Sequence, residues 1–208
     1  MRHATLLILP AALMLAACQP QTPADDAATP PVDPAAPAAS GTAATAPDPA
    51  MPEADAQTGM AAATATLAPT EGNEVAGRLE FSSVDGGIRI TGEVTGLEAG
   101  SEHGFHVHET GDCSAPDGTS AGGHFNPATT AHGRVGQGEH HAGDSDNIVA
   151  NDQGTAMVDT LLRGATLDQG ETGIIGRGVI VHADPDDYTT QPTGNAGDRL
   201  ACGVIEAR

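Results

Sequence analysis

Short runs in which apolar and polar residues alternate most constrain what this chain can fold into. In residues 75–81 and 88–93, apolar residues or glycines largely alternate with polar residues, as in a strand with one buried face. Asp85-Gly86-Gly87 separates these two runs in the manner of a hairpin turn. Four further predicted strands are residues 62–67, 156–162, 178–182 and 200–205. This pattern predicts an all-β sandwich or flattened barrel.

Two long polar stretches interrupt this pattern, residues 109–147 and 184–197. The first is rich in Gly, Asp, His and Pro and shows little strand character. Loops of this length in a compact domain are usually functional. We therefore expect the functional side chains in and beside these two loops.

The N-terminal third differs from the rest in composition. Residues 1–18 combine a short basic head, an apolar stretch and Leu15-Ala16-Ala17-Cys18, which resembles a bacterial lipobox with Cys18 as the lipidated residue. An ordinary secretory signal is the alternative. Residues 19–59 are Ala- and Pro-rich and carry six acids and no base, which predicts a disordered tether. The folded domain should span residues 60–208. We expect a lipoprotein on the periplasmic side of the cell envelope, and Gln19 after the cysteine favours the outer membrane.

The net charge and the cysteine content restrict the classes of function that are compatible with this chain. The net charge is -20 and the chain has eight arginines and no lysine, which argues against nucleic-acid binding. With Cys18 set aside, Cys113 and Cys202 remain, and an even pair in an exported protein predicts a disulfide.

Three histidines fall on predicted strands. In residues 104–108, Phe105 and Val107 point to one side of the strand while His106 and His108 point to the other. His182 ends another strand and points away from its apolar neighbours. Three or four imidazole nitrogens gathered in this way suit copper.

A second set of metal-binding side chains lies in the first long loop: His124, His132, His141 and Asp144. Three nitrogens and one carboxylate form the closed set that structural zinc prefers, and a loop with so little apolar content needs such a cross-link. His140 competes with His141, which we choose because it begins His-x-x-Asp. We interpret His103 as a packed, hydrogen-bonded structural residue.

Four segments together resemble the copper/zinc superoxide dismutase family: residues 104–108 (GFHVH), 123–127 (GHFNP), 141–144 (HAGD) and 194–205 (GNAGDRLACGVI). The resemblance covers nearly all of residues 60–208. Residues 187–192 (DYTTQP) resemble the bacterial, periplasmic branch. The family's fold is a Greek-key, eight-stranded β-sandwich or flattened barrel of immunoglobulin-like type with two long functional loops.

The resemblance implies one copper and one zinc per subunit. Copper would be held by His106, His108, His124 and His182. Zinc would be held by His124, His132, His141 and Asp144, so that His124 bridges both metals. Asp186 would accept hydrogen bonds from one ligand of each metal. Arg199 would pair with the anionic substrate, and the Cys113–Cys202 bridge would hold the loop near it.

The implied activity is disproportionation of superoxide to oxygen and hydrogen peroxide by Cu(II)/Cu(I) cycling, and His124 would take up a proton during this cycle. This activity would protect the cell envelope from oxidative damage. The alternative is a non-catalytic copper- and zinc-binding lipoprotein on the same scaffold. A homodimer is possible, and superoxide is the expected small-molecule partner. Family members often place lysines around the substrate channel; this chain has none, and Arg134 or Arg177 could substitute.

Overall fold

The computed structural model describes residues 62–208, and almost all regular structure in this range is strand. The strands are β1 (Ala63–Pro69), β2 (Ala76–Val84), β3 (Gly87–Thr95), β4 (Glu102–His103), β5 (Phe105–His108), β6 (Ile148–Val149), β7 (Ala156–Leu162), β8 (Gly178–His182), β9 (Arg199–Val204) and β10 (Glu206–Ala207). A single 3₁₀ turn, η1 (Thr119–Ala121), lies in the first long loop. None of the helical structure in residues 62–208 is long and apolar enough to cross a membrane. The predicted signal segment, its Cys18 and the tether fall outside the described residues.

Alternation in the sequence produces the longer strands. Leu79 and Phe81 of β2 and Ile88 and Ile90 of β3 are buried, while the residues between them are not. The turn between β2 and β3 is tight: Gly86 has a φ of 84°, which a side chain would disfavour. The predicted strands at 156–162 and 178–182 form at those bounds as β7 and β8. The short strands β4, β6 and β10 were not predicted, because two residues carry no readable period.

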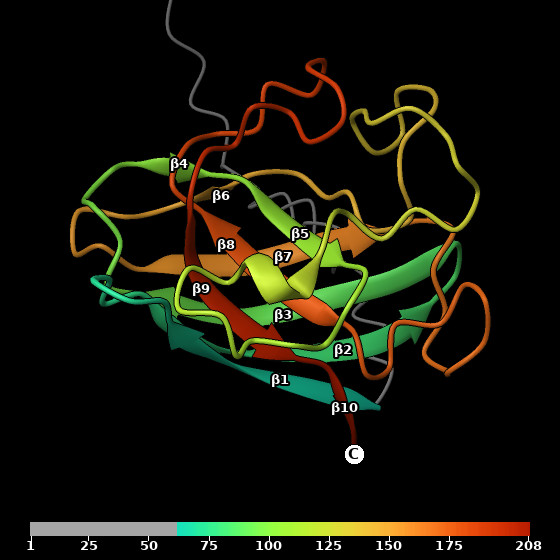
Figure 1. The fold of residues 1–208 in the computed structure, drawn as a ribbon, viewed down its shortest axis with the longest axis horizontal. Coiled ribbons are helices and arrows are strands. Elements are labelled where there is room, and N and C mark those ends of the chain that lie inside the picture. Colours follow the sequence, from blue (N-terminus) through green and yellow to red (C-terminus); the bar gives the residue numbers. More distant parts are fainter. Residues whose placement is uncertain (1–61) are drawn as a thin grey trace, which may run out of the picture. The chain divides into compact units, whose positions relative to one another are not determined.

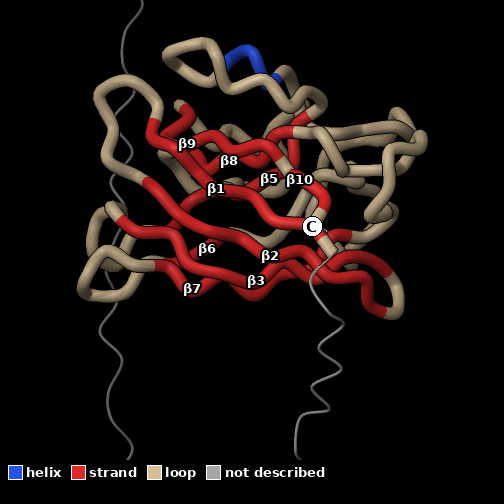
Figure 2. Tube along the Cα trace, turned by 90° about the horizontal axis from the view of Figure 1, so that it is seen from below, coloured by secondary structure: helices blue, strands red, loops and turns tan. Residues whose placement is uncertain are grey.

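Eight antiparallel strands form one curled sheet in the order β5-β8-β9-β1-β2-β3-β7, with β10 beside β1, and β4 and β6 form a separate pair. Figure 2 shows β2, β3 and β7 as one layer below β5, β8 and β9, with β1 passing between them. The chain crosses between the layers from β3 to β5 and from β7 to β8, as in a Greek key. The predicted all-β sandwich or flattened barrel is therefore confirmed.

The core between the two layers sets the direction of the histidines. Phe105 and Val107 of β5 and Val179 and Val181 of β8 are fully buried in this core. Neighbouring residues of a strand point to opposite faces, so the histidines of β5 and β8 leave the sheet on its outer side. The two long loops lie beside each other over that side (Figure 1).

Candidate metal centre

The strand-borne histidines are buried although they lie on the outer face of the sheet. His106, His108 and His182 have relative exposures of 1%, 0% and 4%. Strands β5 and β8 are antiparallel neighbours, so their side chains are close in space. The long loops cover these rings and exclude water from them. The alternation of residues in the sequence did not predict this burial.

Two groups of possible ligand atoms form where strands and loops meet, and within each group the atoms lie within 4.8 Å of one another. The first is His106, His108, His124 and His182. The second is His124, His132, His141 and Asp144. The structure thus brings together every side chain that the sequence assigned to each metal, with His124 in both groups.

Most of these rings have one nitrogen fixed by an oxygen outside the groups. His106 Nε2 and His132 Nε2 lie 2.8 and 3.0 Å from the two carboxylate oxygens of Asp186. His108 Nδ1 donates to the carbonyl of Gly122 at 2.9 Å. Such contacts set the tautomer and orientation of an imidazole, so the other nitrogen is left to face the group.

The remaining nitrogens test whether metals fit. His106 Nδ1, His124 Nε2, His132 Nδ1 and His141 Nδ1 are buried without a hydrogen-bond partner. Burying a polar atom in this way costs on the order of 1–3 kcal/mol, so four in one place need another partner. His132 Nδ1 lies 3.0 Å from Asp144 Oδ2, but it is not aligned for a hydrogen bond. Deprotonated imidazoles with one carboxylate are donors that suit copper and zinc, and metal binding releases any proton that such a ring carries.

His124 differs from the other rings because both of its nitrogens face the groups. Its Nδ1 lies 2.8 Å from Asp144 Oδ1, and its Nε2 has no partner. Burial lowers the pKa of His124 to about 4, and the neighbouring His106 adds to this effect while Asp144 opposes it. Its ring is therefore neutral at pH 7 and can offer a lone pair.

Acidic side chains set the electrostatics of the loop half of the metal centre, by which we mean the second group together with Asp186. Burial favours a neutral Asp144, but contacts with three histidines hold the pKa of its carboxyl far below the usual range. Burial would also lower the pKa of His132, yet its contacts with Asp144 and Asp186 outweigh burial and raise that pKa to about 9. Burial likewise opposes ionisation of Asp186, but its hydrogen bonds with His106 and His132 hold the pKa of its carboxyl below the usual range, so both carboxylates are ionised at neutral pH.

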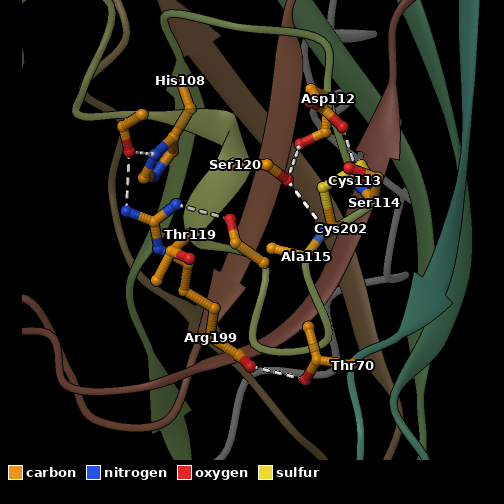
Figure 3. Close-up of a disulfide and its surroundings, with 12 residues drawn as sticks. Thr70, His108, Asp112, Cys113, Ser114, Ala115, Thr119, Ser120, Arg199 and Cys202 are labelled. Carbon is orange, nitrogen blue, oxygen red and sulfur yellow. Dashed lines mark hydrogen bonds between the residues drawn. A yellow bond between two sulfur atoms is a disulfide. The ribbon is translucent and has the colours of Figure 1, made fainter.

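Arg199 lies at the start of β9, beside the strand-borne histidines. Its guanidinium donates to the carbonyls of Gly118 and Gly122 at 2.7 and 2.6 Å, and Gly122 also accepts from His108. In Figure 3 the guanidinium points toward His108 and away from the disulfide. Burial lowers the pKa of Arg199, but a guanidinium stays charged at pH 7.

The predicted disulfide is confirmed: Cys113 and Cys202 are bonded, with their Cα atoms 5.7 Å apart. Cys202 lies in β9 three residues after Arg199, and Cys113 lies in the first long loop. The bond therefore joins the loop that supplies Gly118 and Gly122 to the strand that supplies Arg199 (Figure 3).

Two other histidines within residues 62–208 lie outside both groups. His103 is 4% exposed, and its nitrogens contact Ser101 Oγ and the carbonyl of His182. His140 Nδ1 donates to the carbonyl of His141, and His140 lines a surface cavity with Pro127. The structure thus gathers His141, rather than His140, with the zinc-type donors.

Several residues that shape the site were not found from the sequence. The carbonyl of Gly122 is one, and the side-chain amides of Asn147 and Gln191 are two more, because they hold the backbones of Asp186 and His132. A backbone carbonyl leaves no mark in a sequence. The only sequence signal for Gln191 was its place in the segment 187–192.

Comparison with known proteins agrees with this geometry. A family model described as copper/zinc superoxide dismutase (SODC) matches residues 75–205. The chain is 42% identical over 145 residues to a protein of Aquifex aeolicus (strain VF5) named superoxide dismutase Cu-Zn 2, covering 68% of this chain and 84% of that protein. It is 41% identical over 141 residues to superoxide dismutase Cu-Zn 3 of Arabidopsis thaliana, covering 64% and 84%.

Solved structures show the same likeness. The clock protein EA4 superposes with a TM-score of 0.63 at 40% identity, covering 71% of this chain and 95% of that one. A SOD-like protein from Bacillus subtilis gives a TM-score of 0.62 at 36% identity, covering 68% and 96%.

Proposed function

Because the chain belongs to the copper/zinc superoxide dismutase family, with copper and zinc as its cofactors, we propose that it disproportionates superoxide to oxygen and hydrogen peroxide. The observation that carries the proposal is the pair of buried ligand groups that share His124, with a guanidinium beside the first group. A protein that only stored metals would have no need of that cation.

The ligand roles follow from the two groups. We assign copper to His106, His108, His124 and His182, and zinc to His124, His132, His141 and Asp144. Copper supplies a one-electron redox couple when it is bound, which zinc does not. Asp186 keeps His106 and His132 in one tautomer each, because each of its oxygens accepts from one ring.

Arg199 and His124 act on the substrate in this proposal. Superoxide is a small monoanion, so a partly buried guanidinium attracts and orients it. Two backbone carbonyls hold the guanidinium in place before substrate arrives, which lowers the entropy cost of binding. Nε2 of His124 is unpartnered and can take up a proton for the product.

We also propose that the protein works at the cell envelope. Its support is the sequence of residues 15–18, in which Cys18 follows Leu-Ala-Ala, and the acidic, Pro-rich residues 19–59 between that point and the domain. Lipidation would place the enzyme on the periplasmic side of a membrane, with the outer membrane favoured by Gln19. Mass spectrometry of the mature N-terminus would show two or three acyl chains on Cys18; an unmodified or absent cysteine would refute the anchor.

A homodimer remains a prediction, which light scattering tests.

A superoxide-decay assay on the purified protein, with both metals measured, tests the activity. We expect rapid decay only when copper and zinc are both present. Arg199→Ala should keep both metals and lose about tenfold in rate, because it removes the contact with the anion and replaces none of the proposed metal ligands. Full occupancy of both metals without any disproportionation would instead identify a metal-binding protein.

A further inference from the structure

The segment 187–192 contributes none of the proposed ligands, yet it contacts the loop half of the metal centre at two points. Asp187, Thr190 and Gly194 close it into a turn: Asp187 N donates to the carbonyl of Gly194, and Gly194 N donates to that of Thr190. Gly194 has a φ of 65°, and any Cβ there would overlap the carboxylate of Asp186. The turn is therefore seated directly against Asp186.

At the first point, Gln191 holds the backbone of His132. Its Oε1 accepts from the His132 N–H at 2.9 Å, and its Nε2 donates to the His132 carbonyl at 2.9 Å. A side-chain amide that matches both backbone groups of one residue fixes the position and the rotation of that residue. His132 has no strand to do this, because it lies in a stretch without regular structure.

At the second point, Tyr188 acts on Asp186 through Asn147. The Tyr188 hydroxyl accepts from the Asn147 N–H at 3.0 Å. The Asn147 amide in turn accepts from the N–H of Asp186 and donates to its carbonyl, both at 3.0 Å. The Tyr188 N–H also donates to Asp186 Oδ1 at 2.7 Å. Arg134 lies over the Tyr188 ring, 4.9 Å from its centroid, and so fixes the ring from the first loop.

We propose that Gln191 and Tyr188 are positioning residues for the metal centre, with Gln191 acting on zinc alone and Tyr188 acting on both metals. Among the proposed ligands, Gln191 hydrogen-bonds only to His132, a ligand in the zinc group. Tyr188 steadies Asp186, whose two oxygens contact His106 of the copper group and His132 of the zinc group. This inference rests on the proposed ligand assignment and not on superoxide chemistry.

Metal release and copper spectra of the full, doubly loaded protein test this difference. We compare Gln191→Leu and Tyr188→Phe with the wild type and with Gln153→Leu, a matched control at an exposed glutamine between β6 and β7, outside both long loops. Zinc release is timed with a chromogenic chelator, and the copper environment is read from electron paramagnetic resonance and visible absorption.

Gln191→Leu should release zinc about tenfold faster with an unchanged copper spectrum, because two hydrogen bonds to His132 are lost. Tyr188→Phe should release zinc about threefold faster and also shift the copper spectrum. Gln153→Leu should match the wild type. Zinc release from Gln191→Leu at the control rate, or an unchanged copper spectrum in Tyr188→Phe, would overturn the corresponding half of the proposal. A shifted copper spectrum in Gln191→Leu would indicate general loosening of the metal centre and would also overturn the assignment of Gln191 to zinc alone.

The result is separable from the proposed activity. If the wild type binds both metals but does not disproportionate superoxide, the proposed function fails while the release rates still test the positioning roles. If Gln191→Leu and the control release zinc at the same rate, the positioning role of Gln191 fails while a fast wild-type reaction still supports the enzyme.

Discussion

The two halves of the metal centre reach similar burial by different means. His106, His108 and His182 stand on β5 and β8, whose other faces are locked into the apolar core. His132, His141 and Asp144 lie in a loop, where side-chain hydrogen bonds from residues such as Gln191 replace the sheet. The strand half is therefore built by folding, whereas the loop half is held by polar contacts, and we expect it to depend on its metal as well.

His124 joins the halves, so its loss should have the largest effect. We expect His124→Ala to lose both metals' geometry and to lower superoxide disproportionation by more than about 100-fold. His182→Ala should lose copper and retain zinc, which makes it the matched single-half variant. Metal analysis and the decay assay measure both. Wild-type turnover in His124→Ala would show that His124 does not bridge the two metals.

The loop half can be tested with two adjacent histidines. His141→Ala should lose zinc, because His141 Nδ1 is an unpartnered buried atom facing Asp144. His140→Ala should keep zinc within about twofold of wild-type affinity, since His140 lies outside both groups. Competition with a zinc chelator measures the two affinities. The reverse order would exchange the two assignments.

Removing one metal at a time tests whether the strand half and the loop half of the metal centre differ in their dependence on metal. Zinc removal should lower Tm by about 10 °C and speed amide exchange across residues 124–147, because a metal bound only by the folded state stabilises it. Copper removal should leave β5 and β8 protected, since their order comes from the core. Calorimetry and hydrogen exchange by mass spectrometry measure these effects. Equal losses for both metals would show that the halves do not differ.

The smallest expected effect concerns the approach of substrate to the strand half. A cavity of about 350 Å³ beside Arg199 is lined by Glu71, Asp117 and Asp198 as well. Arg134 pairs with Asp146, and Arg177 stacks on Phe125, so neither lines this cavity to replace the missing lysines. Acids around a single cation oppose an incoming anion, and salt screens that repulsion.

The rate constant for superoxide should therefore rise, or at least not fall, as ionic strength increases. Asp117→Asn should raise it about twofold at low salt, because asparagine keeps an acceptor for Thr119 and removes the charge. Asp152→Asn, at an exposed site that does not line the cavity, should have no effect. Stopped-flow measurements over a salt series decide this, and a rate that falls steeply with salt would instead show attractive steering.

Much of the fold and the donor set could be predicted from the sequence. Alternation in residues 75–81 and 88–93 is a property of a few neighbouring residues, so β2 and β3 were predictable, and so was the outward direction of His106 and His108. Metal-binding side chains are rare enough that their concentration was informative. The pairing of Cys113 with Cys202 followed because only two candidates remained.

Other features depend on residues that meet only in three dimensions. The sequence by itself determined the longer strands, the side chains that can bind metal and the disulfide pair, because these follow from residue type, residue count and local spacing. Only the tertiary structure showed the burial of the rings, the position of His140 outside both ligand groups and the hold of Gln191 on His132, 59 residues away. These depend on two loops folding over one sheet, and no local pattern encodes where such loops meet.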